Sequence, residues 1–246
     1  MEVITSLDNK RIKEYAKLLQ KKHRDEMGMF LVEGEHLVEE AFKSGNLVEV
    51  IKCEDFNRDF DVITTFVTYD VLKKLSNVVA PQKIIGVVKK KECSISGNKI
   101  LLLDDIQDPG NLGTIIRSSV AFGVDTIVLS NNSVDLYNDK VIRSSEGMIF
   151  YVNVIRRDLV DVINELKEDE YKIFGTNVTN GVNVSTVKDT GKFALVMGNE
   201  GAGVKKEILN MCDNYIYIPM TQKCESLNVG VATSIILYEF SKDEII

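Results

Sequence analysis

The sequence predicts an α/β protein in which a small α/β domain precedes a larger domain built on a parallel β-sheet. After residue 98, short apolar runs alternate with stretches of helical spacing, and strands buried between helices are typical of parallel sheets. A polar stretch that ends in turn formers, Lys89–Asn98, separates this pattern from a more mixed one before it,. We therefore expect domains at residues 1–90 and 99–246, joined by a linker at residues 91–98.

The first 90 residues carry helix and strand patterns of their own. Ile12, Tyr15, Leu18 and Leu19 follow helical spacing and predict one helix over residues 10–22,. Strands are expected at residues 30–33, 48–51 and 84–88, and a second helix at residues 35–43.

The larger domain is predicted from six apolar runs. They cover residues 100–103, 126–129, 151–154, 172–175, 193–197 and 215–218. The final helix, expected at residues 227–240, is apolar or small almost throughout, and such a helix must be buried,. A homodimer interface through this C-terminal helix is one way to bury it.

The composition excludes several classes of protein. No apolar run reaches the roughly 18 residues that indicate a membrane helix, and the N-terminus lacks the pattern of a secretory signal. We therefore expect a cytoplasmic protein with no membrane partner. The four cysteines form no Cys-x-x-Cys pair and only two histidines are present, so we expect no metal site,. The net charge of −7 argues against a chain-wide surface for polyanions, although residues 1–24 are locally basic,.

Three loops carry residues that can take part in binding or catalysis. The first of these loops follows the first strand of the larger domain. Within Asp104–Arg117, Pro109 and Gly110 favour a turn and Asn111 can cap the next helix,. Arg117 lies six residues further on, near the mouth where a phosphate group can bind. An ordinary strand-to-helix turn with a surface arginine explains the same residues.

The second loop, Met197–Val204, follows an apolar strand and contains Gly198, Gly201 and Gly203. Glycines let the backbone approach a ligand closely or adopt a positive φ. The spacing differs from the Gly-x-Gly-x-x-Gly of dinucleotide-binding folds, and no Gly-Lys-[Ser/Thr] follows. The alternative is a tight turn with an acidic cap, Glu200.

The third loop, Ile218–Asn228, connects the last strand to the last helix. Ser226 can cap that helix, which would place Asn228 in its first turn. Taken alone, a plain helix cap is the simplest explanation.

The order of the three loops is more specific than any one of them. Asn-x5-Arg, then Gly-Asn-Glu-Gly-x-Gly, then Ile-Pro-Met with Glu-Ser-Leu-Asn resemble the SpoU/TrmH branch of the SPOUT RNA methyltransferases over residues 99–240. Lys140–Gly147 also matches. Residues 30–41 resemble the substrate-binding domain of many members, which is similar to small ribosomal RNA-binding proteins. The resemblance implies a C-terminal trefoil knot, a topology that strand patterns alone do not predict.

The resemblance also implies a reaction, the transfer of a methyl group from S-adenosylmethionine to a ribose 2′-hydroxyl of structured RNA. The N-terminal domain favours large-subunit ribosomal RNA over transfer RNA, and the family resemblance implies a homodimer. The implied contacts to the methyl donor are Thr176, Met197, Gly198, Gly201, Ile218, Met220, Ser226 and Leu227.

The implied catalytic set is Arg117, Asn111, Glu200, Ser226 and Asn228. Arginine is a poor general base, because its pKa exceeds about 12. We therefore interpret Arg117 as a clamp that fixes a phosphate and polarises the hydroxyl group. Both histidines lie in the first domain, so no imidazole base is available in the second. The group that finally accepts the proton stays open.

The basic residues of the N-terminal arm are candidates for contact with the RNA backbone, and Arg117 and Arg143 join them. The alternative is a solvated helix face. The predicted RNA-binding set is Lys10, Arg11, Lys17, Lys21, Lys22, Arg24, Arg117 and Arg143.

The sequence leaves three alternatives to a housekeeping ribosomal RNA enzyme. The chain can methylate transfer RNA, confer drug resistance by the same chemistry, or bind RNA without catalysis as a ribosome-assembly protein. The intact set of Asn111, Arg117, Glu200, Ser226 and Asn228 favours an enzyme over the non-catalytic protein.

Overall fold

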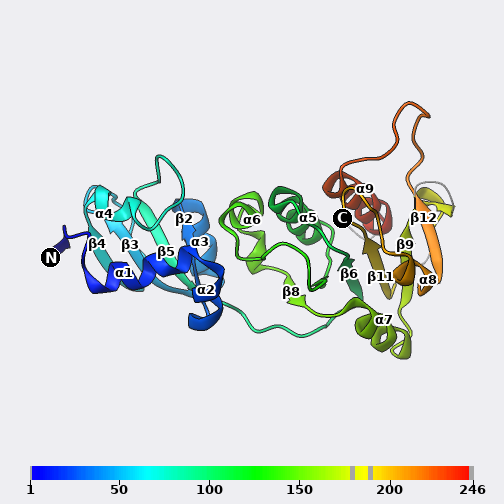
Figure 1. The fold of residues 1–246 in the computed structure, drawn as a ribbon, viewed down its shortest axis with the longest axis horizontal. Helices are drawn as coiled ribbons and strands as arrows, with labels where there is room; N and C mark the ends of the chain where they lie inside the picture. Colours follow the sequence, from blue (N-terminus) through cyan, green and yellow to red (C-terminus); the bar gives the residue numbers. More distant parts are fainter. Residues whose placement is uncertain (1, 178–180, 188–190, 244–246) are drawn as a thin grey trace. The chain divides into compact units, whose positions relative to one another are not determined.

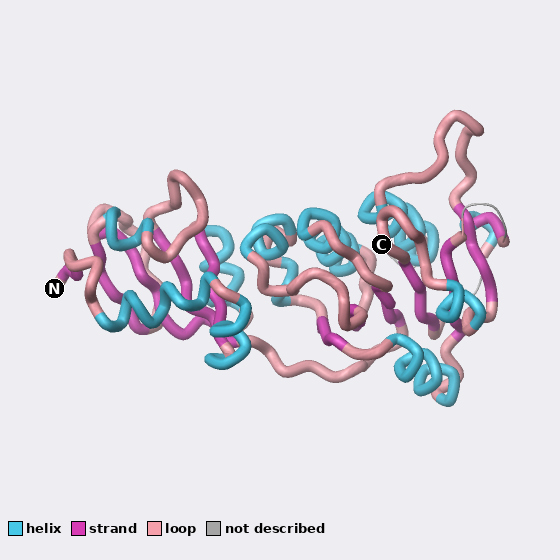
Figure 2. Tube along the Cα trace, in the orientation of Figure 1, coloured by secondary structure: helices cyan, strands magenta, loops and turns pink. Residues whose placement is uncertain are grey.

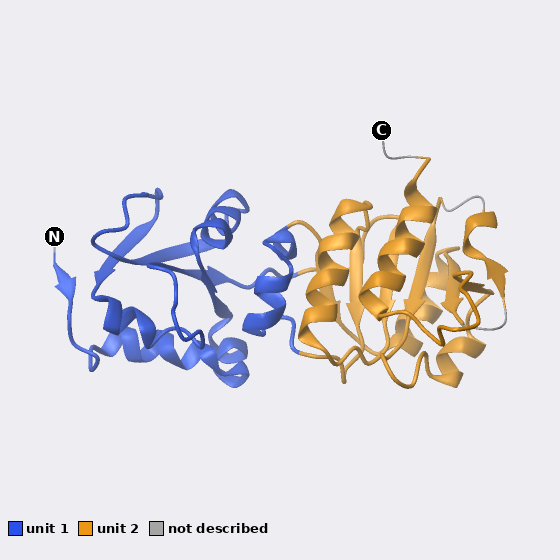
Figure 3. Cartoon of the chain, turned by 90° about the horizontal axis from the view of Figure 1, so that it is seen from above, with its two compact units in different colours: residues 1–92, 135–150 blue, residues 93–134, 151–246 orange. Residues whose placement is uncertain are grey.

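A computed structural model of the chain describes residues 2–177, 181–187 and 191–243. The chain forms two compact units, drawn in different colours in Figure 3. The first unit comprises residues 1–92 and 135–150, and the second comprises residues 93–134 and 151–246. The segment 135–150, which the sequence pattern assigns to the larger domain, thus belongs to the first unit.

The first unit contains a mixed five-stranded sheet with the order β1-β4-β3-β5-β2. Strands β1 and β3 run parallel to β4, whereas β5 is antiparallel to both β2 and β3. The strands are β1 (Val3–Ile4), β2 (Met29–Glu33), β3 (Leu47–Cys53), β4 (Ile63–Val67) and β5 (Ile84–Lys89). Three of them match the sequence prediction. The other two, β1 and β4, were not predicted.

The helices of the first unit include one correction. The single helix predicted over residues 10–22 is interrupted, because Gln20 is extended with φ −103° and ψ 134°. The helical segments are α1 (Lys10–Ala16), η1 (Lys17–Leu19), α2 (Lys21–Met27), α3 (Glu35–Lys43), α4 (Tyr69–Lys73), α6 (Asp139–Ser144) and η2 (Met148–Phe150).

Aromatic and ionic contacts hold the segment 135–150 within the first unit. The ring of Phe30 lies 4.6 Å from that of Tyr137 and 6.3 Å from that of Phe150, measured between centroids. Arg24 donates a 2.6 Å hydrogen bond to Asp135 in an ion pair with little solvent exposure. These contacts join residues more than 100 positions apart in the sequence.

The second unit is built on a seven-stranded sheet with the order β10-β12-β9-β11-β6-β7-β8, in which every pair is parallel. This confirms the α/β class and the parallel sheet predicted from the sequence. The strands are β6 (Lys99–Leu103), β7 (Thr126–Leu129), β8 (Asn153–Arg156), β9 (Lys172–Thr176), β10 (Val182–Asn183), β11 (Phe193–Met197) and β12 (Asn214–Tyr217).

Helices cover both faces of this sheet, as Figure 1 shows. They are α5 (Pro109–Ala121), α7 (Leu159–Glu168), α8 (Lys206–Asn210) and α9 (Val229–Ser241), with a short η3 (Val184–Thr186). Ile100 and Leu102 of β6 pack in one buried cluster with α7 and α8. On α9, the ring of Phe240 packs 5.2 Å from Phe174 and 5.1 Å from Phe193.

The last helix is only partly buried within one chain. Its start is Val229, because Asn228 caps it. The residues facing the sheet are buried, whereas Val231 is 46% exposed and Tyr238 is 52% exposed. The segment between β12 and α9 contains no helix or strand (Figure 2).

Candidate functional site

The carboxyl ends of neighbouring parallel strands bring the three predicted loops to one edge of the sheet. Met197 at the end of β11 is in register with Leu103 at the end of β6, and Val196 with Gly175 of β9. The loops that follow β6 and β11 therefore begin side by side. In open parallel sheets, this edge is where ligands bind.

The first loop places Asn111 and Arg117 on α5. Asp108 is the N-cap, since its side chain accepts a 3.0 Å hydrogen bond from Asn111 N, and Pro109 occupies the first turn,. The expectation that Asn111 caps this helix is therefore wrong, and its own side chain is left available for other contacts. Arg117 is exposed, and among the described residues it has no ion pair or hydrogen bond.

The second loop is a tight turn closed by Asn199. The backbone N–H groups of Asn199 and Gly203 each donate a 3.0 Å hydrogen bond to the other's carbonyl oxygen. The Asn199 side-chain oxygen accepts bonds of 2.9 Å from Gly201 N and 3.0 Å from Ala202 N. A Cβ atom at Gly198 would lie 2.2 Å from the carbonyl carbon of Gly203. Glycine is therefore required at this position by close backbone packing.

The third loop enters α9 through Asn228, whose side-chain oxygen accepts bonds of 3.0 Å from Gly230 N and 3.3 Å from Val231 N. The cap expected at Ser226 is thus located at Asn228 instead. A Cβ at Gly230 would lie 3.1 Å from the Thr114 side chain of α5, so α5 and α9 approach each other closely near their N-terminal ends.

A chain of side-chain hydrogen bonds joins the three loops. Glu200 of the second loop accepts a 3.0 Å bond from Asn111 Nδ2 of the first. Asn111 Oδ1 in turn accepts a 2.8 Å bond from Asn228 Nδ2 of the third. Three of the five predicted catalytic residues are therefore directly linked, although they lie far apart in the sequence.

Glu200 is held as an anion by this arrangement. Partial burial raises the pKa of its carboxyl group, but hydrogen bonds from Asn111 and from backbone N–H groups, including those of Asp108 and Gln107, outweigh that effect. The backbone bonds are 3.2 Å from Asp108 N and 3.3 Å from Gln107 N. The pKa of Glu200 therefore lies below its ordinary value, and the carboxylate is ionised at neutral pH.

A cavity of about 320 Å³ opens between the second and third loops. Its walls are mainly apolar side chains and loop backbone, from the ends of β9, β11 and β12 and the start of α9. The predicted donor contacts all line it, namely Thr176, Met197, Gly198, Gly201, Ile218, Met220, Ser226 and Leu227.

The cavity also has walls that the sequence did not single out. Asn177 lies beyond β9, and Ala232 and Ile236 project from α9. Glu200 lines the same cavity, so the polar chain from Glu200 to Asn228 begins in its wall. Ser226 lines the cavity as well, whereas Arg117 is not one of the lining residues.

The predicted RNA-binding residues of the first unit are mostly engaged in ion pairs. Their partners are Glu49 for Arg11, Glu14 for Lys17, Asp25 for Lys21, Glu26 for Lys22, Asp135 for Arg24 and Asp139 for Arg143. Lys10 is exposed at the start of α1. Arg24 differs from the rest, because it is only 7% exposed and also donates a 2.9 Å bond to Leu18 O. Arg24 therefore has a structural role, and little of its side chain is left for contact with a phosphate backbone.

No helix among residues 2–177, 181–187 and 191–243 is long and apolar enough to cross a membrane. In the same ranges, no group of three or more His, Cys, Asp or Glu side chains is arranged to hold a metal ion.

Two family models match the chain. The model of the SpoU rRNA methylase family matches residues 98–238, and the model of the MRM3-like substrate-binding domain matches residues 9–86.

Individual relatives match over nearly the full length. The 23S rRNA (guanosine(2553)-2′-O)-methyltransferase RlmP of Bacillus subtilis (strain 168) is 40% identical, with coverage of 97% of this chain and 98% of the relative. The crystal structure of an rRNA methyltransferase from Sinorhizobium meliloti superposes with a TM-score of 0.89 at 27% identity, over 100% of this chain and 99% of the other. The AdoMet-bound form of an rRNA methyltransferase from the same organism gives a TM-score of 0.88, with the same identity and coverage.

Proposed function

Because the chain belongs to the SpoU rRNA methylase family, we propose that it transfers a methyl group from S-adenosylmethionine to a ribose 2′-hydroxyl of 23S ribosomal RNA. One observation carries the proposal. The cavity lined by the predicted donor contacts shares Glu200 with the hydrogen-bonded chain that continues to Asn111 and Asn228. In this proposal the cavity holds the donor, and the hydrogen-bonded side chains next to it bind the nucleotide.

The lining of the cavity suits the chemistry of the methyl donor. An adenine ring requires apolar walls and a few backbone hydrogen-bonding groups. Met197, Ile218 and Leu227 supply such walls, and Gly198 and Gly201 leave loop backbone uncovered. When bound, the donor supplies an electrophilic methyl group on a positively charged sulfur. The ionised carboxylate of Glu200 in the cavity wall adds a negative potential that favours a cation.

The remaining chemistry concerns the ribose hydroxyl, which is a weak nucleophile and must lose its proton as it attacks. The second unit contains no histidine. Arg117 offers five N–H donors that are uncommitted within the described residues, and a guanidinium group of this kind binds phosphate with two parallel bonds,. Its role in this proposal is to clamp the RNA phosphate and orient the hydroxyl group. Orientation alone can lower a barrier by about 7–11 kcal/mol.

Asn111, Glu200, Ser226 and Asn228 place the nucleotide in this proposal. Asn111 and Glu200 belong to loops that begin at adjacent strand ends, and Asn228 is fixed by its role as a helix cap. Such side chains are pre-oriented, so little ordering is needed when the RNA binds.

Several features of the assembly are part of the same proposal. The exposed Val231 and Tyr238 of α9 form an apolar face that a second copy would cover, which supports a homodimer through the C-terminal helix,. The C-terminal segment forms a trefoil knot, as the family resemblance implies. The enzyme works in the cytoplasm, where ribosomal RNA is located.

The first unit binds the RNA substrate in this proposal. The functional division predicted at residues 1–90, 91–98 and 99–246 is kept, except that residues 135–150 belong to the first unit. The match to a substrate-binding domain model supports this assignment. The contacts are proposed for Lys10, Arg11, Lys17, Lys21, Lys22 and Arg143, together with Arg117 of the second unit. Arg24 is left out because it is buried.

The test is to incubate the purified chain with labelled S-adenosylmethionine and unmodified 23S ribosomal RNA, and to map 2′-O-methylation along the product. One methylated ribose is expected. Methylation of transfer RNA alone would contradict the proposed substrate. RNA binding without transfer would support the non-catalytic alternative instead.

A further inference from the structure

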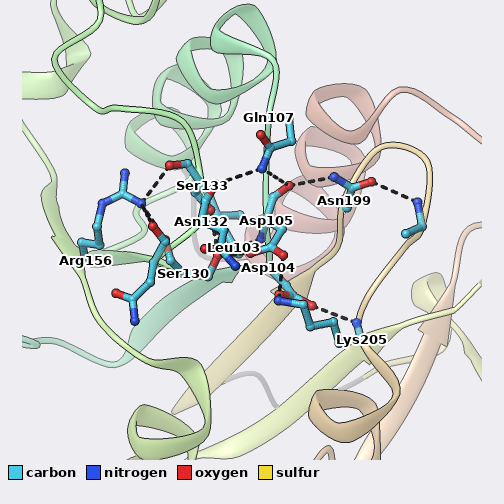
Figure 4. A network of polar contacts seen from close by, with 12 residues as sticks. Leu103, Asp104, Asp105, Gln107, Ser130, Asn132, Ser133, Arg156, Asn199 and Lys205 are labelled. Atoms are coloured by element: carbon cyan, nitrogen blue, oxygen red, sulfur yellow. Dashed lines mark hydrogen bonds and ion pairs between the residues drawn. The ribbon is translucent and has the colours of Figure 1, made fainter. Parts of the chain in front are cut away.

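An ion-pair network joins the first and second loops (Figure 4). Lys205, just before α8, binds two consecutive carboxylates at the end of β6. Its ammonium group lies 3.2 Å from Asp104 Oδ1 and 2.7 Å from Asp105 Oδ2. Its backbone N–H also donates a 2.8 Å bond to Asp104 Oδ2. One residue thereby attaches the end of the second loop to the start of the first.

Asp105 is held in an unusual conformation by these contacts. It is one of the non-glycine residues with a positive φ, at 57°, and such conformations persist only where surrounding contacts determine them. Ser130 donates a 2.7 Å bond to Asp105 Oδ1 and accepts a 2.9 Å bond from Asp105 N. Lys205 and Ser130 therefore fix both the side chain and the backbone of Asp105.

The carbonyl oxygen of Asp105 is the point at which the second loop is attached. It accepts a 2.8 Å hydrogen bond from Asn199 Nδ2. The other end of the same Asn199 side chain accepts the backbone N–H groups of Gly201 and Ala202, and so shapes the turn that contains Glu200. Asp105 thus contributes to the position of Glu200 through the Asn199 amide group, in addition to the bonds that the Glu200 carboxylate accepts from the first loop.

We propose that Lys205 is a positioning residue for methyl transfer, which holds the Asp105 carbonyl where Asn199 binds it and thereby fixes the turn that carries Glu200. This inference rests on the proposed function. The charges support it, since the hydrogen bond to Asp105 raises the pKa of Lys205 above its ordinary value. The ion pair is therefore present at neutral pH. Lys205 does not line the cavity, so it acts on the donor through the turn.

The experiment compares Lys205→Met, Lys205→Arg and Ser130→Ala with the wild-type chain. Lys167→Met is the matched control, because Lys167 forms a similar partly exposed ion pair, 3.1 Å from Asp213, between the last turn of α7 and the start of β12. For each variant, the readouts are the donor Kd by calorimetry, kcat and KM with ribosomal RNA, and Tm.

Lys205→Met is expected to weaken donor affinity and to lower kcat by about tenfold, since small misplacements near reacting groups are costly. Lys205→Arg restores both quantities, because an arginine can bridge the same two carboxylates. Lys167→Met matches the wild type in both. In an Asn199→Ala background, Lys205→Met has no further effect on kcat, since its action passes through Asn199.

A folded Lys205→Met variant with wild-type donor affinity would overturn the inference. It would also be overturned if the loss of kcat in the double variant of Lys205→Met and Asn199→Ala equalled the product of the losses in the two single variants. Should Lys205→Met not fold, Ser130→Ala decides the question, and a wild-type donor Kd in that variant refutes the inference. The donor Kd is measured without RNA. A failure of the inference is therefore distinct from a failure of the proposed RNA substrate.

Discussion

Asn228 Nδ2 donates a 2.8 Å hydrogen bond to Asn111 Oδ1 and so joins the cap of α9 to the first turn of α5. Each asparagine makes a second contact. Asn228 caps α9, and Asn111 donates a hydrogen bond to Glu200. The nucleotide-binding side of the proposed site is therefore built from groups that also hold the fold together. Variants must be chosen so that these two roles can be separated.

Asn228→Asp separates capping from the contact with Asn111. Aspartate caps a helix as well as asparagine does, so Tm should stay close to the wild-type value. The carboxylate has no N–H group to donate to Asn111, so methyl transfer should fall. Asn228→Ala loses both functions and should destabilise the chain by about 1 kcal/mol. Equal activity in Asn228→Asp and the wild type, measured by labelled methyl transfer, would contradict a role for this contact.

Arg117→Ala should lower kcat/KM for RNA by about a hundredfold, a cost similar to the loss of one donor to a reacting group. Tm should not change, because Arg117 is exposed and has no ion pair or hydrogen bond within the described residues. Arg157→Ala is the matched control, since Arg157 is a partly exposed arginine paired with Glu165 on α7. If both variants have the same kinetics, the clamp assigned to Arg117 is wrong.

The lowered pKa of Glu200 should make the stability of the folded chain depend on pH. Its pKa is lowered from the ordinary 4.5 in the folded chain, so the folded state favours the ionised form. The stabilisation is present above pH 4.5 and is lost as the pH falls through the lowered value,. The difference in Tm between the wild type and Glu200→Gln should therefore shrink on acidification. A difference that grows toward acid pH would mean that the pKa of Glu200 is raised.

Arg24→Met tests whether Arg24 is structural. The ion pair with Asp135 is largely buried, with side-chain exposures of 8% and 17%, and loss of one partner in such a pair costs about 3 kcal/mol. Lys21→Met on the same helix removes an exposed pair with Asp25 and should cost less than about 1 kcal/mol,. Chemical denaturation measures both. An unchanged stability in Arg24→Met, together with weaker RNA binding, would mean that Arg24 contacts RNA and is not structural.

Six of the seven strands in the second sheet were predictable because a buried parallel strand leaves an apolar run in the sequence, whereas the two-residue β10 was not predicted. Residues 126–129 and 193–197 were predicted with their observed bounds. The two-residue β1 and the break at Gln20 leave no comparable signal. The placement of residues 135–150 depends on contacts such as Phe30 with Tyr137, which local patterns do not record.

The candidate site was predictable as a set of residues but not as a geometry. The motif order identified Asn111, Glu200 and Asn228, because a family resemblance preserves residue types. The sequence did not indicate that Asn111 bridges the other two, since a hydrogen bond between distant side chains has no periodicity. The attachment of Asn199 to the Asp105 carbonyl was missed for the same reason, although Asn199 belongs to the recognised motif.

The most direct test of the account is a calorimetric titration of S-adenosylmethionine into the purified chain, with and without ribosomal RNA. We predict one donor bound per chain, with affinity lost in Leu227→Asp, which puts a charge into the apolar wall of the cavity, and retained in Leu7→Asp, at an exposed position of the first unit. Absence of donor binding by the folded wild-type chain under both conditions would contradict the account.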